Sequence, residues 1–218
     1  GASKAARAEF KKPRLYRTPV YKTSVLNTQQ RATLRYSSKF ELTSGAGVAS
    51  SRHFSANGLF DPDFAIGGHQ PRGFDQLMAM YDHAVVLNSR IEVFVGSDID
   101  GTKAEILDIS LRDSTFVSSD YRDFEEYGVH KRLLLSDQDG GQESGYLTMS
   151  ANPAKFLGRK DPLSDPELKN SVSANCKEDA WWTITMYGVG GSSSTTNQLI
   201  VTITYDVVFI EPKISPIS

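Results

Sequence analysis

The chain has 218 residues, of which 39% are hydrophobic, and a formal net charge of −2 at pH 7. A chain of this length can bury roughly 70% of its unfolded surface in one domain, so we expect a single domain with a full core. Its one cysteine, Cys176, excludes an intrachain disulfide, and no apolar run is long enough to cross a bilayer. The start, Gly1-Ala2-Ser3-Lys4, lacks the pattern of an export signal, so we expect a soluble protein. It also lacks an initiator Met, which predicts a processed or truncated form, or the ordered part of a longer chain.

The charged residues are unevenly distributed along the chain. Residues 1–40 hold ten Lys and Arg against one acidic residue, so that of the 24 basic and 26 acidic residues only 14 and 25 remain for residues 41–218. Such a basic arm before an acidic body is typical of a polyanion-binding tail, because each cation that neutralises a phosphate releases counterions. A merely solvated basic terminus is the alternative. The candidate phosphate contacts are Lys4, Arg7, Lys11, Lys12, Arg14, Arg17 and Lys22.

The first clear element is a strand from Arg31 to Leu42. Apolar residues such as Leu34, Tyr36 and Phe40 occupy most of its even positions, and the odd positions hold Arg, Thr, Ser, Lys and Glu. This period of two indicates a strand with one face in a core and the other in water. A less distinct strand follows at residues 48–55.

One segment departs from the β pattern. Phe74, Leu77, Met78 and Tyr81 are spaced at i, i+3, i+4 and i+7, which places them on one face of a helix. We expect a two-turn helix here that covers one end of the β structure. A second short helix is expected within residues 120–127.

Strand patterns resume in the middle of the chain. Val85, Leu87, Ile91, Val93 and Val95 alternate with polar residues, and a similar pattern returns at residues 107–111. Gly96 and residues 98–101 supply turn residues between them, so we expect the two strands on either side of a hairpin. Residues 133–135 and 146–149 indicate another strand, turn and strand.

The last third of the chain contains a long connection and two strands. Residues 152–179 include three prolines and mixed charges, which predicts a long surface loop suited to a subunit contact. Residues 181–187 and 199–209 then read as strands, the second strongly alternating. About eight strands without a fixed repeat favour an all-β fold, a single eight-stranded jelly roll of two packed antiparallel sheets with short helices in the loops.

The residues that would carry metal or catalytic chemistry are scattered. The four histidines form no ligand motif and Cys176 has no partner at metal spacing, so no metal and no cofactor are expected, and Cys176 is expected to be a buried bystander. Asp98-Ile99-Asp100-Gly101 departs from a calcium-binding loop and is better explained as a turn. Asp61-Pro62-Asp63 is expected to be a solvated turn rather than a site for a cation shared between subunits. No nucleophile elbow or phosphate-binding loop is present, which argues against an enzyme.

Adjacent residues on a strand point to opposite faces, so only one of Trp181 and Trp182 can enter a core. The other is expected to cover a subunit contact first, and a base-stacking surface second. A sugar-stacking surface remains a third reading, which makes a lectin-like carbohydrate-binding jelly roll the alternative function. A cupin-type enzyme would need a metal cluster that the scattered histidines do not indicate.

The segment from Gly68 to His83 reads GHQPRGFDQLMAMYDH and continues to Ile91 as AVVLNSRI, preceded by NGLFDP at residues 57–62. This segment resembles capsid proteins of circular Rep-encoding single-stranded DNA viruses, the circovirus-like group, in which a short helix precedes a strand of the Y-D-H-x-x-V-L-x-S-x-I type. The specific likeness covers about 35 residues, and the remainder agrees only in layout. Residues 1–22 depart from the pattern, since such proteins usually begin with a denser Arg-rich arm; either that arm has been removed or this chain relies on less charge.

The resemblance implies a viral capsid protein without enzymatic activity. It implies a basic N-terminal arm at residues 1–27 that faces the genome and a jelly-roll shell domain at residues 28–218. Self-assembly into a small icosahedral shell of the simplest symmetry, T=1 with roughly 60 copies, would enclose a circular single-stranded DNA genome. It also implies location in the virion, assembly in the host nucleus and no membrane partner. As candidates for subunit contact we take Arg72, Gln76, Trp181 and Trp182, with Arg72 and Gln76 as candidates for genome contact as well.

Overall fold

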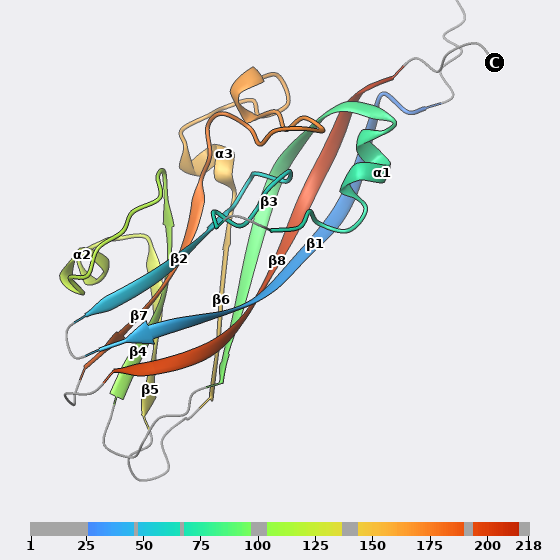
Figure 1. Ribbon diagram of the computed structural model, residues 1–218. Helices are drawn as coiled ribbons and strands as arrows, with labels where there is room; N and C mark the ends of the chain where they lie inside the picture. The colour runs from blue at the N-terminus through green and yellow to red at the C-terminus, as the bar shows by residue number, and fades with distance from the viewer. Residues whose placement is uncertain are drawn as a thin grey trace, which may run out of the picture.

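The computed structural model describes residues 26–45, 48–65, 68–96, 104–136, 144–189 and 194–213. Within them, eight strands form two four-stranded sheets joined by loops and short helices (Figure 1). The strands are β1 (Gln29–Ser44), β2 (Ala49–Ser55), β3 (Tyr81–Gly96), β4 (Ala104–Arg112), β5 (His130–Ser136), β6 (Ser144–Ala151), β7 (Trp181–Gly188) and β8 (Thr195–Pro212). The helices are α1 (Phe74–Met78), α2 (Arg122–Glu125), α3 (Pro153–Phe156) and the 3₁₀ turn η1 (Pro166–Leu168).

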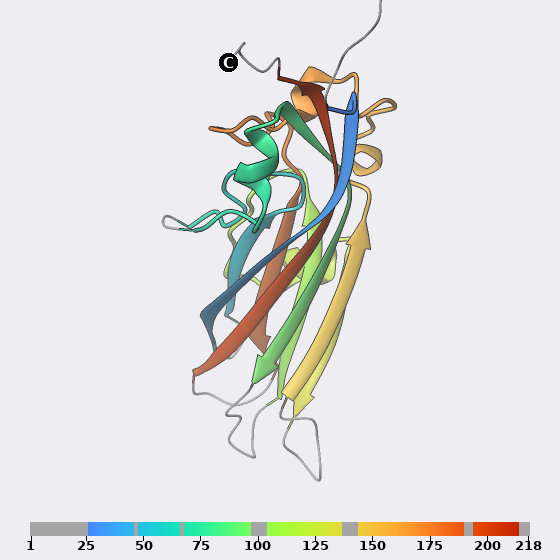
Figure 2. The same ribbon diagram turned by 90° about the vertical axis from the view of Figure 1, so that its right-hand side faces the viewer.

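The strand order identifies the fold as a jelly roll. One sheet has the order β1-β8-β3-β6 and the other β2-β7-β4-β5, and every pairing is antiparallel. Among the described strands, only β4 and β5 are neighbours both in sequence and in a sheet, so the other connections lead from one sheet to the other. The two views in Figures 1 and 2 show the sheets stacked face to face. The predicted fold class is confirmed.

The predicted hairpin between the strands at residues 85–95 and 107–111 is wrong. The first of these strands, β3, pairs with β8 and β6, whereas β4 pairs with β7 and β5 in the other sheet. Turn residues indicate that the chain reverses, but they do not say whether the next strand pairs beside the first or crosses the core to the facing sheet. The intervening turn, including Asp98 to Gly101, lies outside the described residues.

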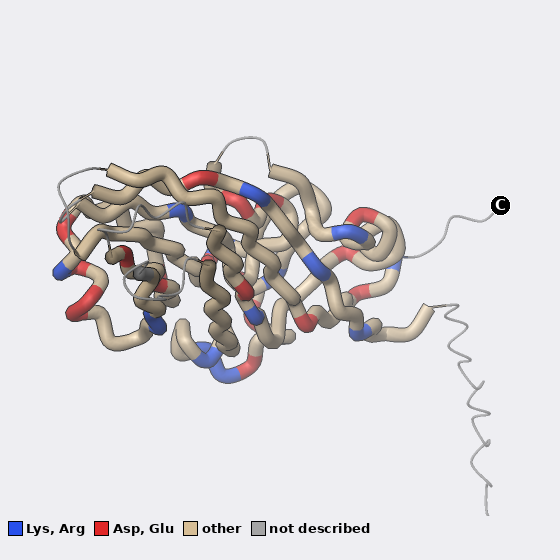
Figure 3. Tube along the Cα trace, turned by 90° about the horizontal axis from the view of Figure 1, so that it is seen from below, with Lys and Arg blue, Asp and Glu red and all other residues tan. Residues whose placement is uncertain are grey.

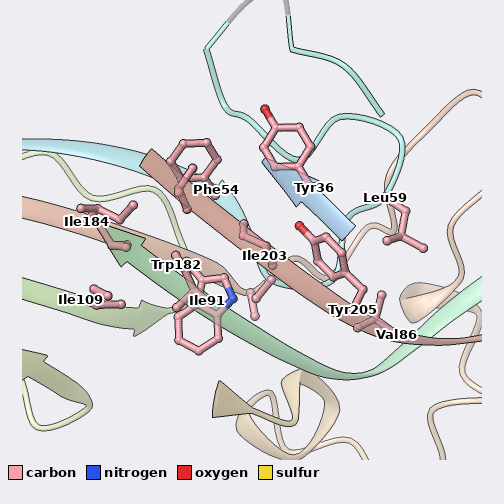
Figure 4. Close-up of a cluster of buried hydrophobic side chains, with 14 of the residues drawn as sticks. Tyr36, Phe54, Leu59, Val86, Ile91, Ile109, Trp182, Ile184, Ile203 and Tyr205 are labelled. Atoms are coloured by element: carbon pink, nitrogen blue, oxygen red, sulfur yellow. The ribbon is translucent and has the colours of Figure 1, made fainter. Parts of the chain in front are cut away.

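The core fills the space between the sheets, and alternation determines which side chains enter it. Along β1 the buried apolar residues are Leu34, Tyr36, Phe40 and Leu42, at the predicted even numbers. From β7, Trp182 enters the same space and is fully buried (Figure 4). Removing such large apolar surfaces from water is the main stabilising contribution to a two-layer fold of this kind.

A β-bulge in β3 changes which residues face the core. The register of β3 against β8 shifts between Val86 and Asn88, so that the buried parity changes from even to odd numbers. Val86 and Ile91 therefore face the main core, whereas Val85 lies on the opposite face. The predicted alternation, which placed Val85 and Leu87 with Ile91, holds only after the bulge. An inserted residue flips every side chain beyond it.

Helix α1 is shorter than predicted. It spans Phe74–Met78, and Phe74 and Met78 are fully buried, while Tyr81 already belongs to β3. Gly73 precedes the helix with a φ of 94°, a left-handed conformation that favours glycine. The helix covers one end of the β1-β8-β3-β6 sheet, as expected (Figure 1). Helix α2 lies within its predicted range.

The segment 152–179 is more than a surface loop. Asn170 is completely buried, and its side chain donates to the carbonyl of Asn57 at 2.8 Å and accepts from the amides of Leu59 (3.0 Å) and Cys176 (3.2 Å). The loop is therefore tied to the segment after β2 by side-chain hydrogen bonds that satisfy buried backbone groups. Proline content and charge indicated irregular structure but could not reveal this network.

Candidate nucleic-acid and subunit interfaces

The face of the β1-β8-β3-β6 sheet that points away from the core is called here the outer face. It is largely polar and exposed, except where Val85, Val208 and Ile210 are buried with Leu163 packed against them. On β1 it presents Arg31, Arg35 and Lys39, the odd positions of the alternating strand. Register places Arg31 next to Val208, Arg35 opposite Thr204 and Lys39 opposite Ile200 on β8. Cations thus follow one edge of the sheet at regular spacing, because every second residue of a strand shares a face.

Some of these cations are neutralised and others are not. Arg31 pairs with Asp206, its Nε donating to Oδ1 at 2.7 Å, and Arg90 on β3 pairs with Glu92 at 2.7 Å. For Arg35 and Lys39, the described part of the chain contains no ion pair. Figure 3 shows that Lys and Arg are interleaved with Asp and Glu across the body rather than gathered in one block. The cations of the outer face that lack an ion pair are therefore isolated residues and do not form a continuous basic patch.

A cleft of about 580 Å³ lies between β1 and α1. Arg35 lines it from the strand, and Arg72 and Gln76, both exposed, line it from the helix and the turn before it. The ring of His69, also on the cleft, stacks on Tyr36 with centroids 4.6 Å apart. The structure thus brings the two predicted residues Arg72 and Gln76 together, and adds Arg35. The alternation of the first strand already placed Arg35 on its polar face, which could have marked Arg35 as a candidate. Nothing in the sequence indicated that it lies near Arg72.

The two tryptophans separate as adjacent strand residues must. Trp182 is fully buried, and its Nε1 donates to the hydroxyl of Ser89 at 2.9 Å. The prediction that Trp182 is a subunit contact is therefore wrong, because the core of its own chain already covers the whole side chain. Trp181 is partly buried and meets Phe64 edge-on at 5.6 Å. It remains a candidate for subunit contact.

The candidate phosphate contacts of the arm, Lys4 to Lys22, lie outside the described residues. The point where the arm joins the body is described. The Tyr81 hydroxyl, at the start of β3, donates to the carbonyl of Asn27 at 3.1 Å. The chain therefore enters the body at the end that carries α1.

Asp63 and the Cys176 thiol, which the sequence offered as a candidate metal ligand and a candidate reactive group, are both buried. Among the described residues no group of three or more His, Cys, Asp and Glu is placed to hold a metal ion. Asp63 is buried and is bound by Arg52, with Nε to Oδ1 at 3.0 Å and Nη2 to Oδ2 at 2.7 Å, so the expectation of a solvated turn at residues 61–63 is wrong. Cys176 is buried, as expected, and burial raises the pKa of its thiol. No described helix is long and apolar enough to span a membrane.

A buried carboxylate and a half-buried imidazole form an acid–base pair on the sheet beside α2. Asp108 on β4 is completely buried, and its Oδ2 is 2.6 Å from Nδ1 of His130 on β5. Burial raises the pKa of Asp108 from 3.8 to about 6, against the opposing influence of His130, while Glu125 raises it further and Arg112 lowers it. Sequence reasoning missed this pair, because the two residues are brought together only by strand pairing.

The Asp108→Asn variant should flatten the pH dependence of stability. Since the pKa of Asp108 is 3.8 unfolded and about 6 folded, the folded state binds this proton more tightly, so its contribution is fully present below about pH 4 and is lost towards pH 6. Relative to the variant, the wild type should lose on the order of 1–3 kcal/mol of unfolding free energy across this window. Urea unfolding at several pH values measures this, and parallel profiles for the two proteins would contradict it.

Comparisons with known proteins give matches only at the level of structure. No protein-family model matches the chain. No curated protein sequence matches it. Among solved structures, the decameric BFDV capsid protein has a TM-score of 0.46 at 8% identity, covering 84% of this chain and 100% of that one. A chain of Desmodium yellow mottle tymovirus (TM-score 0.44, 13% identity) covers 95% of this chain and 99% of its own, and one from a semi-empty particle of Macrobrachium rosenbergii nodavirus (0.44, 11%) covers 89% and 100%. These structures of low identity all come from viruses.

Proposed function

We propose that this chain is the shell-forming subunit of a small viral capsid that encloses a circular single-stranded DNA genome. The observation that carries the proposal is the jelly roll itself, with the strand orders β1-β8-β3-β6 and β2-β7-β4-β5 in its two sheets. A strongly basic sequence precedes it. Viral capsid proteins are among the principal users of this architecture. A polyanion-binding arm is of direct use to a container of nucleic acid.

The arm and the body have different tasks in this proposal. Residues 1–27 face the genome and contact its phosphates through Lys and Arg, with little sequence preference, since phosphate contacts do not read base edges. Residues 28–218 form the shell, which closes with icosahedral symmetry, in the simplest case T=1 with roughly 60 copies. Arg72, Gln76 and Trp181 are the subunit contacts, and the shell is assembled in the host nucleus and located in the virion.

Neither tryptophan supports the carbohydrate-binding alternative. A sugar-stacking platform requires an exposed aromatic face. Trp182 is fully buried and Trp181 is partly covered by Phe64, so the residues that suggested such a platform do not form one. The capsid reading also explains the arm, which the lectin reading leaves without a role.

Purified full-length chain is expected to assemble into uniform closed particles. Negative-stain imaging and sedimentation velocity over a range of salt and pH test this directly. A species that stays monomeric under all conditions would overturn the capsid proposal, because closed shells require self-complementary interfaces.

A further inference from the structure

Three large apolar side chains stand in a line on the outer face. Phe94 on β3 is 47% exposed, Tyr146 on β6 is 52% exposed and Ile200 on β8 is 44% exposed. Register places Phe94 directly opposite both Tyr146 and Ile200, and Ile200 directly opposite Lys39 on β1. These four residues form one row across all four strands, which we call the aromatic row.

The core does not need the aromatic row. The neighbours of Phe94 in sequence, Val93 and Val95, are fully buried on the other face, and the same holds for Leu199 and Val201 beside Ile200. A solvent-facing strand position ordinarily carries a polar residue, as Thr202 and Thr204 do further along β8. Large apolar groups that gather at an exposed place indicate a binding surface.

The geometry of the row suits flat ring ligands. Directly opposed residues on antiparallel strands have Cβ atoms roughly 5 Å apart, so the side chains of Phe94 and Tyr146 start from neighbouring positions on the sheet. The Tyr146 hydroxyl donates to Oε1 of Glu92 at 2.8 Å, and Glu92 also pairs with Arg90. These contacts restrain the Tyr146 ring and engage the Glu92 carboxylate in the adjacent row.

Cations and hydroxyls continue the surface beyond the row. The adjacent row holds Ser37, Thr202, Glu92 and Thr148, and the row after it holds Arg35, Thr204, Arg90 and Ser150. Lys39 and Arg35 have no ion pair within the described chain and lie on the same strand edge. Lys39 and Arg35 lie on the edge strand β1, with Ile200 of β8 between Lys39 and Phe94. Cations and aromatic rings on one face match a polymer of alternating phosphates and bases.

A protein partner fits this surface less well. Along the strands the apolar strip is only one residue wide, because polar residues flank it on both sides. On the side away from Arg35 these include Glu41, Gln198 and Ser144. A stable protein interface buries about 800 Å² on each partner around an apolar centre, which a single row does not supply.

We propose that the outer face binds single-stranded nucleic acid, with Phe94 and Tyr146 stacking on bases and Lys39 and Arg35 contacting phosphates. This inference rests on the proposed function and adds a second contact with the packaged strand, on the body and distinct from the arm. Stacking on aromatic rings tolerates any base, so the surface discriminates single strands from duplexes rather than one sequence from another.

The test measures the affinity of the double variant Phe94→Leu/Tyr146→Leu and of the wild type, both as the whole chain, for a single-stranded oligonucleotide. The probe is fluorescent oligothymidylate of about 20 nucleotides, which is longer than one single-strand footprint. Leucine keeps the apolar surface and removes the rings, and both residues are exposed, so folding is preserved. The double variant is expected to bind roughly 10- to 100-fold more weakly with an unchanged salt slope, whereas Lys39→Gln should reduce the slope by about 0.7. Phe64→Leu, which alters an exposed ring beside the other sheet, is the matched control and should leave binding unchanged.

The outcomes separate this inference from the function on which it rests. If the double variant still forms particles and binds the oligonucleotide with unchanged affinity, the aromatic row does not bind nucleic acid. The capsid proposal would not be affected by that result. Normal affinity with failed assembly would identify the row as a subunit contact and also overturn the inference. Oligouridylate in a parallel titration distinguishes DNA from RNA as the source of the strand, and a duplex that binds as tightly as either would contradict the stacking mode. Cross-linking of 5-iodouracil oligonucleotides to Phe94 or Tyr146 would support it directly.

Discussion

Replacing Trp182 with alanine is expected to lower the free energy of unfolding by about 3–5 kcal/mol. The indole is fully buried between the sheets and donates to Ser89 at 2.9 Å, so truncation leaves a cavity and a buried hydroxyl without its partner. The midpoint of urea unfolding, followed by circular dichroism, measures the loss. Assembly should fail as well, since the unstable subunit cannot hold its interfaces.

The matched control is Trp181→Ala on the same strand. Trp181 is only partly buried and packs against Phe64, so we expect a loss of about 1–2 kcal/mol. If Trp181 is a subunit contact, this variant should remain folded yet assemble poorly. Equal destabilisation by the two substitutions would contradict the assignment of Trp182 alone to the core.

Neutralising the seven arm cations with glutamine is expected to weaken binding of single-stranded DNA by roughly 10²–10⁴-fold at low salt. Each Lys or Arg that leaves a phosphate removes about 0.7 from the slope of log affinity against log salt, so the slope should fall by up to about 5. Filter binding or fluorescence anisotropy across a salt series measures both quantities. The changed residues are Lys4, Arg7, Lys11, Lys12, Arg14, Arg17 and Lys22.

The fold should not respond to that change, and thermal unfolding of the variant should match the wild type. A control that replaces the exposed Lys155, Lys160 and Lys177 with glutamine removes cations of the segment 152–179 and should alter DNA affinity little. An arm variant with wild-type affinity would show that the arm is not the tether. Loss of affinity in the body control instead would move the binding site to the loop at residues 152–179.

The sequence by itself determined the strands and much of their orientation. The alternation in β1 correctly predicted which of its faces is buried, and a strand longer than ten residues leaves little room for another assignment. The same holds for β8, whose odd positions from Thr195 to Val207 are all buried. Burying one face of a two-sided strand imposes a period of two, and that period is visible in any single strand without knowledge of its partners.

Only the tertiary structure decided which strands pair and which residues meet. The partner of β3 was mispredicted, because a reversal of the chain is a local signal whereas pairing depends on how two whole sheets bury their faces. The bulge at Val86 to Asn88 and the choice of Trp182 over Trp181 for the core follow from register, which one residue can invert. The cleft of Arg35 and Arg72, the pair of Asp108 and His130, and the aromatic row each join residues that lie far apart in the sequence. No local pattern encodes such meetings, because they depend on where the two sheets place distant segments side by side.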